Sequence, residues 1–162
     1  MANEKIEKAL NEQINAELYS AYLYFAMAAH FDSNNLPGFA HWMKIQAKEE
    51  TTHALKIYGF VNEVGGKVVL EAVGKPPVDF GSPLQAFEQV LKHEKHVTSL
   101  IHNLVKLARN ESDFAAENFL QWFVAEQVEE EAAATKIVEE LKMIGDAKHA
   151  LFMMDRHLGS RA

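Results

Sequence analysis

The chain has 162 residues, a length that suits one domain with one sizeable core. Asp and Glu number 23 against 16 Lys and Arg, and the resulting net charge of -7 disfavours a nucleic-acid partner and favours cations. Cys is absent, which excludes disulfides, thiolate nucleophiles and sulfur ligands to metals. With only 8 Gly and 4 Pro for turns, the composition favours long helices over a β-sandwich or barrel.

The first residues are polar, and the longest apolar run covers only residues 21–29. A membrane span needs about 20 such residues. We therefore expect no membrane partner, no export signal and a cytoplasmic location.

Pro and Gly gather at residues 34–38 and 65–83 and divide the chain into long segments. Helices are predicted over residues 4–33, 37–64, 83–109 and 112–144, followed by a short C-terminal helix within 146–158. Ser112 is the predicted N-cap of the fourth helix, and Gly145 is its predicted C-terminal cap.

Each long segment carries a stripe of core positions spaced by three and four residues, the pattern of a helix packed along its whole length. In the third segment the stripe reads Leu84, Phe87, Leu91, Glu94, Thr98, Ile101, Val105 and Ala108. Four stripes predict an all-α protein built on a four-helix bundle, with one domain over residues 1–162.

Connection lengths constrain the topology. The first and third connections are short and predict antiparallel neighbours. The middle one, residues 65–82, can reach about 59 Å, whereas a helix of about 27 residues is only about 40 Å long. We therefore predict a crossover along the bundle and an up-down-down-up order, in which the second and third helices are parallel.

The core stripes are interrupted by polar residues near the middle of every helix, so these residues should meet at one level of the bundle. They are Glu17, Glu50, His53, Glu94, Gln127 and Glu130. A buried carboxylate costs several kcal/mol unless it is paired or bound to a metal, and no stripe carries Lys or Arg. A single such Glu is more often a boundary residue, and a single His is more often a hydrogen-bonded core residue. Four carboxylates at one level instead predict a cation site.

Four stretches carry a family resemblance: NEQINAELYSAYLY, QAKEETTHA, KHEKH and FLQWFVAEQVEEE. Through them the chain resembles the non-haem bacterial ferritins over essentially its whole length. The resemblance implies a di-iron centre, with one iron held by Glu17, Glu50 and His53 and the second held by Glu50, Glu94 and Glu130. It also implies that Gln127 lies beside the metals and that Tyr24 donates electrons. A third iron would be held by Glu49, Glu126, Glu129 and Glu130.

Haem is not expected, because Gln127 and Glu130 replace the second Glu-x-x-His motif of haem-binding relatives, and Thr51 and Thr52 stand where those relatives have Met. His93 and His96 flank Glu94, and we expect both to turn away from the metals. The tail at residues 149–158 resembles the family's fifth helix, which lines a channel of the shell. A simple packing helix is the alternative.

Four carboxylates match the charge of two Fe²⁺ ions. Hard oxygen ligands with a single imidazole also suit Fe³⁺ as it forms and leave positions for O₂ or peroxide, so the predicted reaction is oxidation of Fe²⁺ by O₂ or H₂O₂. The resemblance adds storage of Fe³⁺ as a mineral inside a homo-oligomeric shell of 24 chains. The alternative is a di-iron oxidase or peroxidase that acts on an external substrate without storing a mineral. A purely structural bundle would leave the predicted buried carboxylates unexplained.

Overall fold

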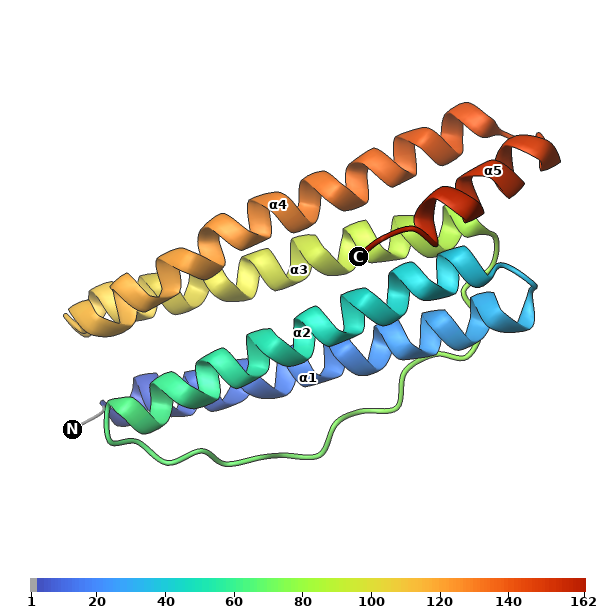
Figure 1. The fold of residues 1–162 in the computed structure, drawn as a ribbon. Helices are drawn as coiled ribbons and strands as arrows, with labels where there is room; N and C mark the ends of the chain where they lie inside the picture. The colour runs from blue at the N-terminus through green and yellow to red at the C-terminus, as the bar shows by residue number, and fades with distance from the viewer. Residues whose placement is uncertain (1–2) are drawn as a thin grey trace.

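The computed structural model describes residues 3–162, and these form five helices and no strand. The helices are α1 (Glu4–Ser33), α2 (Pro37–Glu63), α3 (Pro83–Asn110), α4 (Phe114–Ile144) and α5 (Lys148–Leu158) (Figure 1). The all-α prediction is confirmed. None of these helices is both long and apolar enough to cross a membrane.

Side-chain caps begin α1, α3 and α4, with one correction to the prediction. The Asn3 side chain accepts a hydrogen bond from the Lys5 backbone N–H at 2.9 Å, and Ser82 forms a capping box with Gln85 at the start of α3. At α4 the cap is Asp113, which accepts from the Ala116 N–H at 3.0 Å. The predicted cap Ser112 is wrong, because this residue adopts a φ of 54° in the turn before the helix.

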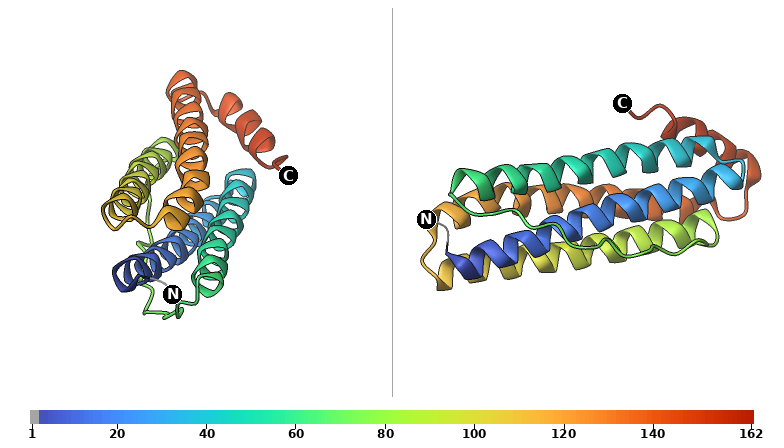
Figure 2. Two further views of the ribbon diagram at one scale, coloured as in Figure 1. Left: turned by 90° about the vertical axis from the view of Figure 1, so that its left-hand side faces the viewer. Right: turned by 90° about the horizontal axis from the view of Figure 1, so that it is seen from below.

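The helices form two antiparallel pairs, α1 with α2 and α3 with α4. The segment between α2 and α3 returns along the bundle from one end to the other, so α2 and α3 are parallel (Figures 1 and 2). Hydrogen bonds hold this crossover against α1: Asn11 donates to the Lys67 carbonyl at 2.9 Å and accepts from the Val69 N–H at 2.8 Å. The predicted up-down-down-up topology is confirmed.

The core stripe of α3 differs in register from the prediction. Leu84, Leu91 and Thr98 are only half-buried, whereas Val90 and Val97 are buried. A helix has 3.6 residues per turn, so steps of three and four can be placed in either order from a given residue. The order 87, 90, 94, 97, 101 is the one that faces the other helices, and it still includes Glu94.

Two apolar cores fill the bundle, one at each end. The α5-end core contains Tyr24, Phe31, Phe39, Met43, Ala47, Phe87, Val90, Ala134 and Ile137, among others. The opposite-end core contains Ile6, Leu10, Ile14, Ala54, Ile57, Val97, Ile101, Leu120 and Phe123, among others. On every long helix the change from one core to the other falls at the predicted polar level.

Helix α5 packs mainly against α2 and supplies the hydrogen-bond acceptor for the first turn of α2. No side chain of the preceding loop caps α2. Instead the Asp155 carboxylate accepts from the Gly38 and Phe39 backbone N–H groups at 2.9 and 3.0 Å. A Cβ at position 38 would lie 1.6 Å from the Asp155 carbonyl oxygen, so only glycine allows this approach. The predicted short fifth helix is therefore confirmed, and it is docked by a specific contact.

Candidate metal centre

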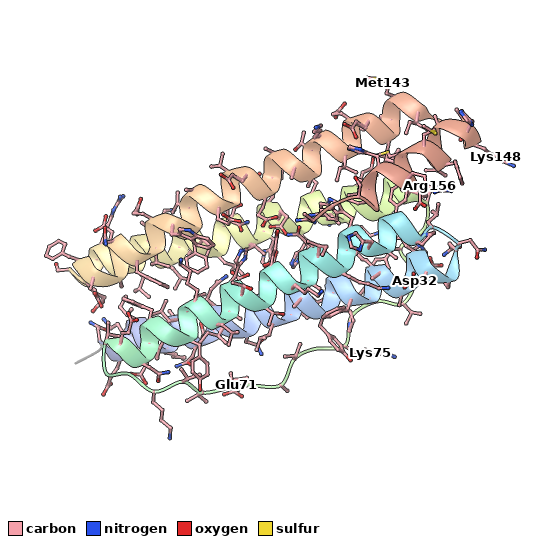
Figure 3. The ribbon with its side chains drawn as sticks, in the orientation of Figure 1. Asp32, Glu71, Lys75, Met143, Lys148 and Arg156 are labelled. Carbon is pink, nitrogen blue, oxygen red and sulfur yellow. The ribbon has the colours of Figure 1, made fainter. Side chains whose placement is uncertain are left out.

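The four long helices place one acidic group each at mid-length, between the two apolar cores. Glu17, Glu50 and Glu94 are each 1% exposed and Glu130 is 7% exposed. His53 and Gln127 are buried beside them. Figure 3 shows side chains that carry oxygen and nitrogen filling the space between the helix pairs at this level.

These side chains form three groups in which the possible ligand atoms lie within 4.8 Å of one another. The groups are Glu17 with Glu50 and His53, Glu50 with Glu94 and Glu130, and His53 with Glu126 and Glu130. Glu50 belongs to the first two groups. A carboxylate has two oxygens, so this arrangement suits two adjacent cations that share the Glu50 carboxylate.

Neutral donors hydrogen-bond to every acid of this carboxylate cluster (Glu17, Glu50, Glu94 and Glu130). Gln13 donates to Glu17 at 2.9 Å, and Gln46 donates to Glu130 at 2.7 Å and to Glu50 at 3.2 Å. Gln127 and the Tyr24 hydroxyl donate to Glu94, the amide at 3.1 Å. These hydrogen bonds orient the carboxylates, and their donors are Gln13, Gln46, Gln127 and Tyr24.

Sequence reasoning missed two of these donors. Gln13 lies four residues before Glu17, and Gln46 lies four residues before Glu50, so each pair shares a helix face. That spacing was the available signal. The sequence does not reveal which carboxylate of another helix the Gln46 amide also contacts.

Burial raises the pKa of all four acids, and repulsion from a neighbouring acid adds to this effect for Glu17, Glu50 and Glu130. Desolvation is the main cause of the raised pKa values of Glu17 and Glu50, and the negative charge of a neighbouring acid adds to it. Desolvation also raises the pKa of Glu94, and it raises the pKa of Glu130 to about 8, with repulsion from Glu94 as the second cause. The metal-free cluster therefore retains protons at neutral pH, which an incoming cation must displace.

The carboxylate cluster fits a pair of cations for two reasons: in the described part of the chain it lacks positively charged Lys or Arg partners at Glu17 and Glu50, and its possible ligands are of a suitable type. The Oε2 of Glu17 is the one buried side-chain oxygen or nitrogen in residues 3–162 without a hydrogen-bond partner. Over the same residues the ion pairs within 4.0 Å that involve Glu17 or Glu50 come from His53, and none comes from Lys or Arg. Carboxylate oxygens with one imidazole are hard ligands that suit Fe²⁺ and Fe³⁺.

Tyr24 is fully buried next to Glu94. Desolvation and the nearby Glu94 charge raise its pKa well above the ordinary tyrosine value, so the phenol is protonated at physiological pH. The predicted neighbour of the metal centre is thus in direct hydrogen-bond contact with one of its candidate ligands.

Only some of the residues predicted to bind a third iron lie close to one another in the structure. Glu126 is half-buried, and its Oε1 lies 3.7 Å from the His53 Nε2. Glu49 instead lies 3.1 Å from the Arg161 guanidinium, and Glu129 is exposed. Neither Glu49 nor Glu129 belongs to the three ligand groups found in residues 3–162. Consecutive helical residues point about 100° apart, so an inward Glu130 turns Glu129 outward.

His93 faces away from the carboxylate cluster and hydrogen-bonds to Ser20 Oγ at 2.7 Å. Burial, with a smaller effect from His96, lowers the pKa of His93 to about 4. Neither histidine belongs to a ligand group in the described chain.

Comparison with known proteins identifies the class. Residues 7–144 match the model of the ferritin-like domain, and the chain belongs to the ferritin family. A bacterial non-heme ferritin of Bacteroides fragilis is 44% identical over 161 residues, which cover 99% of this chain and 100% of that protein. A bacterial non-heme ferritin of Staphylococcus aureus is 41% identical over 161 residues, which cover 99% of this chain and 97% of that protein.

Among solved structures, an open pore ferritin from the hyperthermophilic archaeon Archaeoglobus fulgidus is 56% identical. The two chains match over 100% of both lengths with a TM-score of 0.99. The predicted family resemblance is therefore confirmed.

Proposed function

We propose that this protein is an iron-storage ferritin that oxidises Fe²⁺ with O₂ or H₂O₂ at the carboxylate cluster. The observation that carries the proposal is the position of Glu50, which belongs to two adjacent ligand groups in the buried middle of the bundle. Glu17, Glu50 and His53 would bind one Fe²⁺, and Glu50, Glu94 and Glu130 would bind the other. Each Fe²⁺ gives up one electron, so an adjacent pair can reduce O₂ to H₂O₂, or H₂O₂ to water.

The surrounding residues have separate roles in this proposal. Gln13, Gln46 and Gln127 orient the carboxylates through the hydrogen bonds described above. Tyr24 donates a hydrogen bond to Glu94 and is near enough to serve as the electron donor that the family resemblance implies. Glu126 and Glu130, with Glu49 and Glu129 from the less buried side, would hold a third iron.

Storage requires a closed assembly, and we propose a shell of 24 copies. Large apolar side chains are exposed along α1 and the crossover: Tyr22 is 54% exposed, Phe25 is 47% exposed and Val78 is 76% exposed. A contiguous exposed apolar surface of this kind is typical of a protein interface. The proposed shell would bury it against a second copy. The predicted cytoplasmic location and the predicted absence of haem and of a nucleic-acid partner stay predictions.

Anaerobic titration with Fe²⁺ tests the site, and particle size tests storage. We expect two tight sites per chain, a weaker third site, rapid oxidation when O₂ is added, and a 24-chain particle that accumulates an electron-dense mineral. One tight site per chain would contradict the paired geometry. A monomer or dimer that oxidises iron without forming mineral would instead support an oxidase acting on an external substrate.

A further inference from the structure

The side chain of Arg161 contacts α2 residues that lie beside the carboxylate cluster. Its guanidinium lies 3.1 Å from Glu49 Oε2, donates to Gln46 Oε1 at 3.1 Å and donates to the Trp42 carbonyl at 3.1 Å. It also lies 4.5 Å from the centre of the Trp42 ring, and the Arg161 carbonyl hydrogen-bonds to His41 at 2.7 Å. Every one of these partners belongs to α2.

Two independent anchors hold Arg161 in this position. The first is the docking of α5 on the start of α2 through Asp155, after which the tail runs back toward the middle of the bundle (Figure 1). The second is the Gln46 amide. Gln46 is buried and its Nε2 donates to Glu130 and Glu50, so its Oε1 is a fixed acceptor that faces the guanidinium. An Arg side chain can only donate, which matches this polarity.

The acid that pairs with Arg161 in this arrangement is Glu49. It precedes Glu50 directly, it is half-buried, and its negative charge is close enough to Glu130 to contribute to the raised pKa of that acid. The family resemblance makes Glu49 a ligand of the third iron. In the structure the carboxylate is paired with Arg161 instead, so a third cation must replace the guanidinium to bind there.

We propose that Arg161 is a positioning residue that competes with the third cation for Glu49 and so weakens the third site relative to the central pair. This inference rests on the proposed function, because it takes the carboxylate cluster to be a metal centre. The C-terminal guanidinium keeps Glu49 occupied until the cation concentration is high enough to displace it. The third site then fills last and empties first.

The test is a calorimetric titration of the full-length, metal-free assembly with redox-inert Zn²⁺. Arg161→Met removes the charge and keeps much of the side chain's apolar length. Arg109→Met is the matched control, because it removes the guanidinium of another Arg–Glu ion pair, with Glu117. We expect Arg161→Met to tighten the third site about two- to fivefold, the range for a partly exposed ion pair, and to leave the pair of tight sites in place. Arg109→Met should match the parent.

Two further variants separate competition from a structural effect. Arg161→Lys keeps a positive charge near Glu49 but lacks the planar set of donors, so its third-site affinity should fall between those of the parent and Arg161→Met. In Glu49→Gln the carboxylate is gone, and adding Arg161→Met to it should produce no further tightening.

An unchanged or weakened third site in Arg161→Met would overturn the inference, as would tightening of equal size in the Glu49→Gln background. Failure of the proposed function would give a different result, because the parent protein itself would then lack the pair of tight sites.

Discussion

The two ends of the bundle and its middle use the same four helices in opposite ways. At the ends the helices meet through large apolar side chains such as Phe31, Phe87 and Phe123, each contributing about 1.5–3 kcal/mol when fully buried. In the middle the same stripes present four acids, whose burial opposes folding unless they are protonated or bound to cations. The apolar ends fix the backbone, and the middle can therefore keep a site that does not stabilise the metal-free protein.

The largest expected effect comes from an end of the bundle. Phe87 is fully buried against Phe31, Phe39 and Trp42. Phe87→Ala should lower the free energy of unfolding by about 3–5 kcal/mol because it opens a cavity. Chemical denaturation of the metal-free protein measures this. Below its unfolding transition the variant should still bind two Zn²⁺ tightly per chain, and loss of that binding would show that the ends and the middle are not separable.

The second prediction concerns the carboxylate cluster in the middle of the bundle, where one substitution should lower activity without lowering stability. Glu130→Met removes an acid that is protonated at neutral pH, and Gln46 keeps Glu50 as an acceptor. The metal-free variant should be as stable as the parent, or more stable by about 1–4 kcal/mol. Fe²⁺ oxidation should fall by about 100-fold or more, since even outer contacts of a metal site contribute 10- to 100-fold.

Glu139→Met, at an exposed position of the same helix, is the control for this change and should behave like the parent in both assays. Zn²⁺ should raise the melting temperature of the parent more than that of Glu130→Met, because a ligand that binds only the folded state stabilises it. A Glu130→Met protein that is strongly destabilised yet fully active would mean that the acid is structural.

A smaller effect is expected from His53, which supplies the single imidazole of the cluster. His53→Ala should slow Fe²⁺ oxidation about tenfold and weaken one of the two tight sites, because three carboxylates of the second ion's group are unaffected. Stopped-flow oxidation and Zn²⁺ titration measure the two effects. His102→Ala, at an exposed position of α3, should change neither. Disassembly of the proposed shell in His53→Ala would assign this residue a structural role.

The last expected effect is a dependence of the free energy of unfolding on pH, which is gradual and small within any one pH unit. The folded pKa of Glu130 is about 8, above the unfolded carboxyl value, so between about pH 4.5 and 8 the folded state binds more protons than the unfolded state. The metal-free protein should therefore lose stability as pH rises through this range, by up to about 1.4 kcal/mol per pH unit for each such acid. Glu130→Met should make the slope shallower, whereas Phe87→Ala should shift the whole curve without changing the slope. A slope that is unchanged in Glu130→Met would show that this acid does not retain its proton.

Most of the fold could be predicted because its signals are local. Periodic core positions and the Pro and Gly breaks define helices whose ends differ from the prediction by at most two residues, and the loop lengths define the topology. The register of α3 and the cap at Ser112 were wrong, since one sequence pattern allowed two choices and packing selected between them.

The candidate site was predictable for a different reason, because four acids on apolar stripes have no local explanation. The contacts that surround these acids could not be predicted in the same way. The Arg161 side chain contacts Glu49 and Gln46 only because α5 docks on α2, and no spacing in the sequence connects positions so far apart. The ion pair of Glu49 likewise depends on how the tail packs, whereas the exposed position of Glu129 follows from the inward position of Glu130.

The contact between Asp155 and the start of α2 also has a consequence for biosynthesis. The backbone N–H groups of Gly38 and Phe39 find their acceptor 117 and 116 residues further along the chain. While the protein is being translated, the second helix is made early but its first turn stays incomplete until the last helix has left the ribosome. The junction at Gly38 therefore closes only after α5 has been translated.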